Sequence, residues 1–421
     1  MAPAIRRQGL TIVGTLATAY VASHFFRASN VTIGLDLMRD LQIGPEALGA
    51  LTGAFFFGFS AMQIPCGFFF DRYGPRLTVF GMLLLAVAGG TVFTLASNLP
   101  TLVAGRALMG AGFGVMLVGS MVVIARWFPP EWFSTLSAVV MSIGLIGNLL
   151  ATSPLAWAIE AVGWRSVFGG VVAFTAVAAI AVLLVVRDAP PGHPFLVRHA
   201  ETPGDMLRGL VEVLRTRHLP LILVLNFCSY ACTFTIQGLW GGPYLREVHG
   251  LSRIDSGNVL LSAVVAYQVG ILVIGPLDRV LDTRKWIAIV GTLVVVGILA
   301  TLAIWNHPPV WVPIMGIAGI GFVSASSTMI MTHARGIFPD RLIGRGMATV
   351  NTSVMLGVAC MQTLSGVILG AFEPLADGAR SELAYRSLFG FMSVVLLVAV
   401  SVYGQAPDVR PSDEMRAREV A

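Results

Sequence analysis

Long apolar runs separated by short polar stretches dominate this sequence of 421 residues. Each run is close to the ~20 residues with which a helix crosses ~30 Å of hydrocarbon. The runs predict twelve helices, at residues 10–34, 46–70, 77–97, 100–124, 134–159, 166–186, 219–245, 256–277, 286–305, 309–332, 346–371 and 386–404. Because a membrane span must satisfy its own backbone hydrogen bonds, we expect an all-α membrane protein.

The composition agrees with a membrane protein and argues against a soluble one. The chain is 56% hydrophobic and 12% charged, with a mean hydropathy of +0.81. A soluble domain of this length needs more charge to cover its surface. The net charge is +5, but the basic residues punctuate the apolar runs instead of forming one basic face. We therefore expect a lipid bilayer and no nucleic acid as partner.

The basic residues also predict the orientation. With the N-terminus inside the cell, nineteen of the 27 Lys and Arg residues fall in cytoplasmic segments and six outside, while Arg27 and Arg106 lie within the membrane. This bias places both termini in the cytoplasm. The apolar run from Leu10 is too long for the core of a signal peptide, so we expect it to remain as the first span. Lys285 is the only lysine, which favours a GC-rich genome and a bacterial inner membrane.

The two halves of the chain resemble each other at a shift of about 210 residues. The segment 128–131 aligns with 338–341, and Gly147 aligns with Gly357. Because both copies of six spans start inside, they form a parallel repeat about an axis normal to the membrane. In such a repeat we expect the solute site between the two halves, near the middle of the bilayer.

This repeat predicts two six-helix bundles, at residues 1–187 and 219–421, the second with a cytoplasmic tail. A polar cytoplasmic linker at 188–218 joins them. Its amphipathic piece, Met206–Leu214, is either a surface helix on lipid headgroups or a plain connector between the bundles.

A motif between the second and third predicted spans reads Gly67-x-x-x-Asp71-Arg72-x-Gly74-x-Arg76. Here the chain resembles the major facilitator superfamily, whose signature at this place is Gly-x-x-x-Asp-Arg-x-Gly-x-Arg. A degenerate copy at 275–285, made of Gly275, Asp278 and Arg279 with Arg284 and Lys285, follows the eighth span. In the fourth span Arg106-x-x-x-Gly110-x-Gly112-x-Gly114 resembles a second signature. The resemblance covers the whole chain and implies a twelve-helix transporter.

The resemblance implies that the first motif, Gly67 to Arg76, is a conformational latch. Asp71 is expected at the C-terminal end of the second span, where the helix dipole repels a carboxylate. The usual partner in the family is the start of the eleventh helix, near Gly346. The alternative is that Asp71 and Arg72 only set the topology.

Arg106 is a cation inside the membrane, where burial costs about 2.5–3.5 kcal/mol even on the lenient scale, so it must face protein or water. In relatives this arginine is associated with proton coupling or with helix packing, and both interpretations stay open.

Three polar residues of the first span, His24, Arg27 and Asn30, are spaced three apart and share one helix face. His24 has a reference pKa of about 6.5 and is a candidate for proton binding. The stripe resembles the pattern of the anion:cation symporter branch, in which an arginine holds a substrate carboxylate or phosphate. The planar guanidinium fork suits a carboxylate. The alternative is a cation satisfied by helix carbonyls or by a neighbouring helix.

The predicted spans carry no Asp or Glu near their midpoints, so the pore is expected to be cationic and to favour anions or zwitterions. Gln237 and Tyr267 are further candidates for solute binding, although polar residues at this depth also serve as contacts between helices. The cysteines lie in apolar runs without histidine or carboxylate neighbours, so we expect no metal site.

These observations predict a secondary active transporter that moves a small organic anion or zwitterion by alternating access, through proton-coupled uptake. No ATP-binding Gly-rich loop occurs, so we expect a gradient as energy source and no cofactor. We also expect a monomer. The alternatives are a proton antiporter that exports metabolites or drugs, and a sensor or assembly factor that transports nothing. An enzyme is disfavoured, because no nucleophile, base and orienting group occur together.

Overall fold

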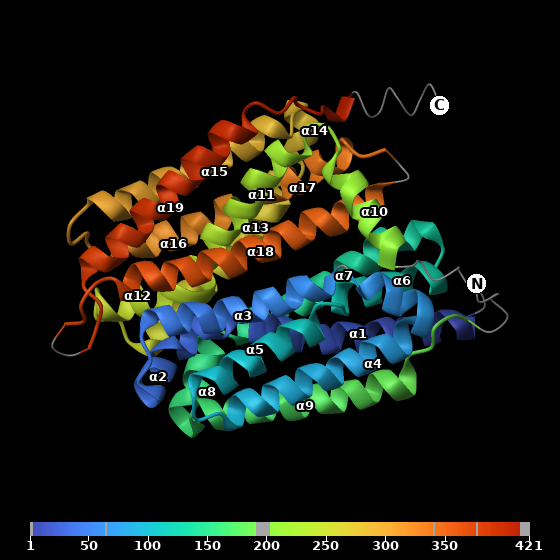
Figure 1. Cartoon of the computed structure of the whole chain (residues 1–421), viewed down its shortest axis with the longest axis horizontal. Coiled ribbons are helices and arrows are strands. Elements are labelled where there is room, and N and C mark those ends of the chain that lie inside the picture. Colours follow the sequence, from blue (N-terminus) through green and yellow to red (C-terminus); the bar gives the residue numbers. More distant parts are fainter. Residues whose placement is uncertain (1–2, 64, 191–202, 340–341, 376–377, 413–421) are drawn as a thin grey trace. The chain divides into compact units, whose positions relative to one another are not determined.

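The computed structural model describes residues 3–63, 65–190, 203–339, 342–375 and 378–412, which are helical throughout apart from short connections (Figure 1). The helices of the first half are α1 (Pro3–Ala28), α2 (Asn30–Leu41), α3 (Pro45–Gln63), α4 (Cys66–Leu95), α5 (Leu99–Phe113), α6 (Met116–Trp127), α7 (Pro130–Leu150), α8 (Ser153–Val162) and α9 (Trp164–Val185).

The second half contains α10 (Pro203–Leu214), α11 (Leu219–Thr235), the π-helix η1 (Ile236–Trp240), α12 (Gly241–Glu247), α13 (Arg253–Ile274), α14 (Leu277–Leu281), α15 (Lys285–Ile304), α16 (Trp311–Ser324), α17 (Ser327–Gly336), α18 (Ile343–Gly370) and α19 (Glu382–Tyr403). Within the described residues no strand is assigned, so the predicted all-α fold is confirmed.

The predicted spans correspond to these helices, although several are broken. In the described part of the chain, ten helices are long and apolar enough to cross a membrane. The helices α7 and α8 pass the same test only as a pair, bent by 46° at their break, where Pro154 stands at the start of α8; counted as one span, they make an eleventh. The remaining span, predicted at 46–70, is divided between α3 and α4 on either side of residue 64.

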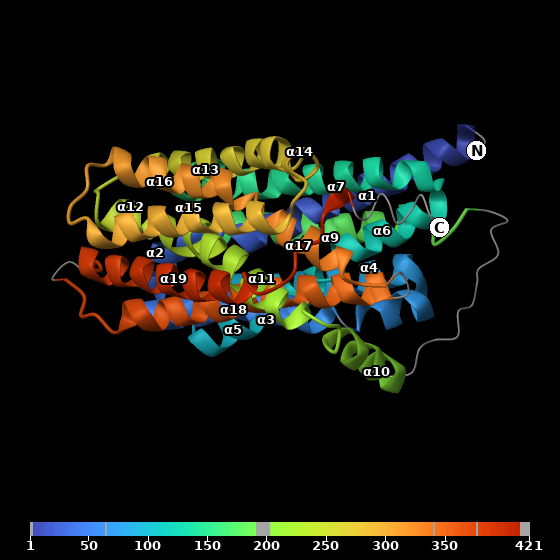
Figure 2. The same ribbon diagram turned by 90° about the horizontal axis from the view of Figure 1, so that it is seen from above.

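The chain folds into two compact units. The first comprises Met1–Gln42 and Ala54–Pro203, and the second Ile43–Gly53 and Gly204–Ala421. In the first unit α1 packs along α7 and α9, and α4 packs along α5 and α9 (Figure 1). In the second unit α11 packs along α18, and α15 packs along α19 and α16 (Figure 2). The boundaries that we expect for the linker, 188 and 218, stay a prediction.

The repeat-aligned glycines Gly147 and Gly357 make the same kind of contact in the two units. A Cβ atom at Gly147 in α7 would lie 2.1 Å from the carbonyl oxygen of Val21 in α1. A Cβ atom at Gly357 in α18 would lie 1.9 Å from the carbonyl oxygen of Phe227 in α11. Glycine therefore lets these helix pairs approach backbone to backbone, as small residues do in membrane bundles.

The first turns of α3 belong to the second unit because they pack directly on α18. A Cβ atom at Gly49 would lie 2.9 Å from the Cα atom of Gly366, and one at Gly366 would lie 2.4 Å from the carbonyl oxygen of Pro45. The contact again depends on glycines on both helices.

The sequence placed the motif at 67–76 between two predicted spans, whereas the structure places it within one kinked helix. The helix α4 contains the whole motif, and Gly74 interrupts it with φ 73° and ψ 166°. A positive φ of this kind is favourable only for glycine. Asp71 therefore lies in the last turn before the break, at the end of a helical segment, as predicted.

Candidate functional site

Arg27 lies at the end of α1, two residues before the junction with α2 at Ser29. Its side chain is buried, with 6% of the residue exposed. The guanidinium carbon is 4.8 Å from the ring centroid of Phe59, and the phenol of Tyr20 interacts with the guanidinium. The Nε atom has no hydrogen-bond partner, and among the described residues no carboxylate pairs with this arginine. A buried cation with an unpaired Nε donor suits an anionic ligand.

His24 lies one turn before Arg27 and is also buried. Its Nδ1 atom is 3.3 Å from Oδ1 of Asn148 in α7. The ring meets Tyr20 edge to face, with the centroids 4.6 Å apart. A Cβ atom at Gly144 would lie 2.5 Å from the Tyr20 ring, so this glycine makes the room for the pair. The imidazole is thus held between two helices, next to a fixed positive charge.

Asn30 is the third residue of the predicted stripe and begins α2. It is fully buried, beyond the junction at Ser29. The structure therefore keeps His24 and Arg27 on one helix and places Asn30 on the next. Sequence reasoning did not single out Tyr20 as part of this site, although its spacing of four and seven residues from His24 and Arg27 is a helical one.

Arg106 is fully buried in α5 and contacts the same region of α1. Its Nη1 atom donates to the carbonyl oxygen of Phe26, at 3.0 Å. The guanidinium carbon is 5.5 Å and 5.2 Å from the ring centroids of Phe55 and Phe93. The guanidinium thus donates to a carbonyl at the end of α1 and lies against aromatic rings, while its Nε and Nη2 atoms have no hydrogen-bond partner. The choice between packing and proton coupling stays open.

Gln237 and Tyr267 both lie in the second unit, where they are partly buried. Gln237 belongs to the π-helix η1, and its Nε2 atom has no hydrogen-bond partner. In the same π-helix Trp240 donates to Oγ of Ser365, at 2.7 Å. A π-turn inside an α-helical span widens the helix and is frequent at functional sites. Tyr267 packs at the border of an apolar cluster.

Gln362 is a buried polar residue of the second unit that we did not select from the sequence. It is fully buried, and both atoms of its side-chain amide lack a hydrogen-bond partner. Its backbone carbonyl accepts from Oγ of Ser365, the acceptor of Trp240. The polar groups that the structure describes beside η1 are therefore uncharged amides, a hydroxyl and an indole.

The motif residues are placed around the kink in α4. A Cβ atom added at Gly67 would meet no atom within 4 Å. Arg72 is exposed, and its guanidinium lies over the rings of Phe68 and Tyr73. The Arg76 N–H donates to Asp188 and its Nε atom to the carbonyl oxygen of Leu183, both at 2.8 Å. The side chain of Asp71 is outside the described part of the structure, so the latch stays a prediction.

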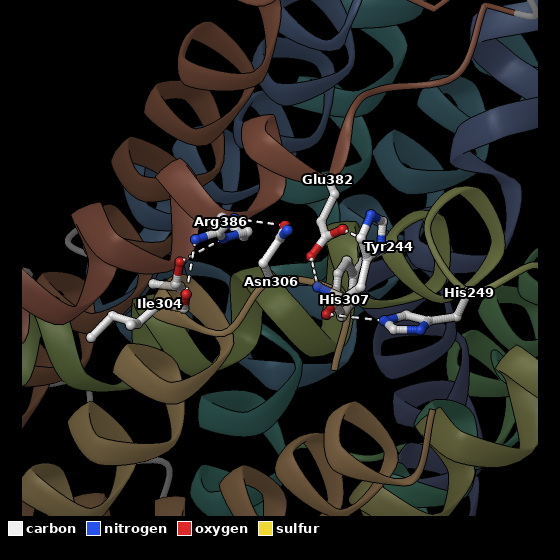
Figure 3. Close-up of polar contacts among 8 residues, drawn as sticks. Tyr244, His249, Ile304, Asn306, His307, Glu382 and Arg386 are labelled. Atoms are coloured by element: carbon white, nitrogen blue, oxygen red, sulfur yellow. Dashed lines mark hydrogen bonds and ion pairs between the residues drawn. The ribbon is translucent and has the colours of Figure 1, made fainter. Parts of the chain in front are cut away.

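A second polar cluster lies at the end of the second unit that the predicted topology places outside (Figure 3). Glu382 accepts from the N–H of His307 at 2.7 Å and lies 2.6 Å from its Nδ1 atom. Arg386 donates to the carbonyl of Ile304, and Nε2 of His249 is 3.2 Å from the hydroxyl of Tyr244. Burial lowers the pKa of His249. These pairs fasten loops to the ends of helices, and no sequence pattern pointed to them.

Comparison with known proteins places this site in a transporter. The family model described as Major Facilitator Superfamily matches residues 16–265 and 222–419. The chain belongs to this superfamily and is a multi-pass membrane transporter, not an enzyme.

Two relatives and one solved structure illustrate the match. A D-galactonate transporter of Escherichia coli O6:H1 is 24% identical, over 93% of this chain and 96% of its own. A quinolone resistance transporter of Acinetobacter baumannii is 23% identical, and the match covers 93% of this chain and 92% of that transporter. A bacterial homolog of the human lysosomal transporter Spinster, in an inward-facing and unoccupied conformation, is 17% identical with a TM-score of 0.75, covering 96% of this chain and 97% of its own. This structure shares the fold, which confirms the predicted twelve-helix class.

Proposed function

We propose that this protein imports a small organic acid or zwitterion together with protons, and that Arg27 binds the carboxylate of the solute. The observation that carries this proposal is the buried guanidinium of Arg27, with an Nε atom that has no hydrogen-bond partner. A buried donor of this kind costs free energy unless an acceptor reaches it, and a carboxylate is an acceptor that also matches the charge. The D-galactonate transporter among the relatives supports a hydroxy acid as solute.

The position of His24, one turn from Arg27, supports the proposed coupling to protons. A second positive charge beside the guanidinium is unfavourable until an anion binds between them. A carboxylate on Arg27 would therefore favour a proton on His24, and by reciprocity the proton would favour the carboxylate. Gln237 and Tyr267 are proposed as further solute contacts of the second unit. We place the protein in the bacterial inner membrane as a monomer, with both termini in the cytoplasm.

The test is uptake by purified protein in proteoliposomes under an imposed pH gradient. The panel contains D-galactonate, succinate and inorganic phosphate as anions, a zwitterionic amino acid, and a cationic dye. We expect uptake of a carboxylate that depends on the inward proton gradient. Export of the dye or of a quinolone would favour the antiporter suggested by the relative from Acinetobacter baumannii. Absence of flux for every compound would favour a sensor.

We predict that His24→Gln removes the pH dependence of transport. Glutamine keeps a hydrogen-bonding group opposite Asn148 but does not titrate. Uptake by the variant at a fixed solute gradient should stay nearly constant between pH 5.5 and 7.5, about one unit on either side of the reference pKa of histidine. His218→Gln, at the partly buried start of α11, is the control. A variant at His24 with the wild-type pH profile would place the proton elsewhere.

We also predict that Asp71→Asn leaves folding and membrane insertion intact but impairs transport. A carboxylate at the end of a helical segment is repelled by the helix dipole and needs a positive partner outside that segment. If this contact forms in only one state of the cycle, its loss should lower turnover by about tenfold, within the usual range of coupling energies. Wild-type flux in the reconstituted variant would contradict the latch.

A further inference from the structure

Two carboxylates, one in each unit, hold the start of a helix in the same way. In the first unit Asp188 follows the last helix, α9, and accepts the backbone N–H of Arg76 at 2.8 Å. The side chain of Arg76 in turn donates from its Nε atom to the carbonyl oxygen of Leu183 in α9, also at 2.8 Å. One residue after the kink is thus fastened to the end of α9 by its backbone and by its side chain.

In the second unit Asp408 follows the last helix, α19, and accepts the backbone N–H of Lys285 at 3.2 Å. The Nζ atom of Lys285 donates to the carbonyl oxygen of Gly404, the C-cap residue of α19, at 2.7 Å. The other oxygen of Asp408 accepts from the hydroxyl of Thr283, which itself accepts the N–H of Trp286. Both units therefore contain a similar arrangement of backbone and side-chain contacts.

The first N–H groups of a helix have no partner within the helix, and a side chain at the N-cap position normally accepts from one of them. After the kink in α4 this position is Gly74, which has no side chain. Asp188 supplies the missing acceptor from the segment that follows α9, and its charge is favourable at a helix N-terminus. A Cβ atom at Gly74 would lie 2.6 Å from the Asp188 carboxylate. In α15 the N-cap residue Arg284 likewise makes no side-chain cap.

We propose that Asp188 and Asp408 are positioning residues of the transport cycle. They hold the signature motif at 67–76 and its degenerate copy at 275–285 against the last helix of their own unit. The motif and that helix then move together, and the two carboxylates set the rate of turnover without contacting the solute. The link to turnover rests on the transport function proposed above, whereas the caps themselves do not.

The caps are tested first without any solute, by hydrogen exchange of the purified full-length protein. We expect Asp188→Ala to speed exchange in peptides that cover Arg76 by about tenfold, the effect of losing a typical cap. Peptides that cover Lys285 should stay unchanged. Asp408→Ala should give the reverse pattern. Unchanged exchange at the matching helix start in either alanine variant would overturn the proposal.

Turnover is then measured as uptake of D-galactonate, or of the carboxylate that the panel identifies. Both alanine variants should lose about tenfold in maximal rate, as expected for a lost cap, with the KM within about twofold of wild type. Asp188→Asn and Asp408→Asn should recover most of the rate, because the amide oxygen still accepts the N–H. The control is Asp255→Ala, whose carboxylate accepts from Ser252 within its own helix start; it should keep the wild-type rate.

The outcomes separate this inference from the proposed function. Faster exchange with a wild-type maximal rate would make the two residues plain structural contacts and would overturn the positioning role. Asparagine variants as slow as the alanine variants would also overturn it, because the hydrogen bond would then not be the cause. If wild type transports no member of the panel, the proposed function fails, and the exchange pattern alone decides whether the caps hold the motifs.

Discussion

Arg27→Ala should abolish binding of the organic acid while the protein remains folded. Removal of one partner from a desolvated, hydrogen-bonded charge pair costs about 2–5 kcal/mol, which is roughly 30-fold to several thousand-fold in affinity. Arg27 fits this case because it is buried and because Phe59 and Tyr20 surround it with aromatic rings. The measurement is the thermal stabilisation of the purified protein by its solute, compared between wild type and variant.

Arg27→Lys separates charge from geometry. Lysine keeps the positive charge but lacks the planar fork that matches a carboxylate, so binding should be weakened less than in the alanine variant. The control is Arg165→Ala, which removes an exposed arginine paired with Asp40 at 3.3 Å. A surface pair of this kind contributes little, and the control should bind as wild type does. Equal stabilisation in all four proteins would leave Arg27 a structural residue and would remove the anion assignment.

The spans could be predicted from the sequence because the bilayer imposes one rule on every segment. A run of apolar residues must be helical there, and its length is fixed by the membrane. The breaks within spans were less visible. Pro154 marks the bend between α7 and α8. The π-helix around Gln237 contains no proline itself, but Pro243 follows it by three residues and lacks the N–H that would pair with the preceding turn. This local signal does not distinguish a π-turn from a plain kink, so the π-helix was not predicted.

The two cations of the site, Arg27 and Arg106, could also be predicted, because a cation in a membrane span is rare and must be compensated. The residues that contact them and His24 could not be predicted. The contact of His24 with Asn148 joins residues 124 positions apart, and the bond from Arg106 to the carbonyl of Phe26 joins residues 80 apart. Asp188 carried no signal at all, since a single acidic residue after a span usually belongs to a solvated connection. Only the folded chain shows that it caps another helix.

The glycines that the repeat aligns should be among the least replaceable residues of the chain. We expect Gly147→Ala and Gly357→Ala each to destabilise the protein by about 3 kcal/mol or more, at the upper end of the cost of overpacking. The new methyl groups would lie 2.1 Å and 1.9 Å from backbone carbonyl oxygens, whereas real Cβ atoms essentially never come closer than 3.0 Å. A carbonyl in a helix cannot rotate away, so the two helices of each pair must separate.

Thermal unfolding in detergent tests this expectation, with Gly14→Ala and Gly297→Ala as matched controls. Both control glycines lie in membrane-spanning helices and have no atom within 4 Å of the added Cβ, so alanine should be neutral or slightly stabilising there. A melting temperature equal to wild type in either test variant would show that the helices separate at no cost in stability.

The two test variants should differ in their effect on solute binding. The Cβ atom at Gly147 would also lie 2.9 Å from the Cβ atom of His24, so any folded Gly147→Ala protein should bind the acid more weakly, because its helix pair carries His24 and Arg27.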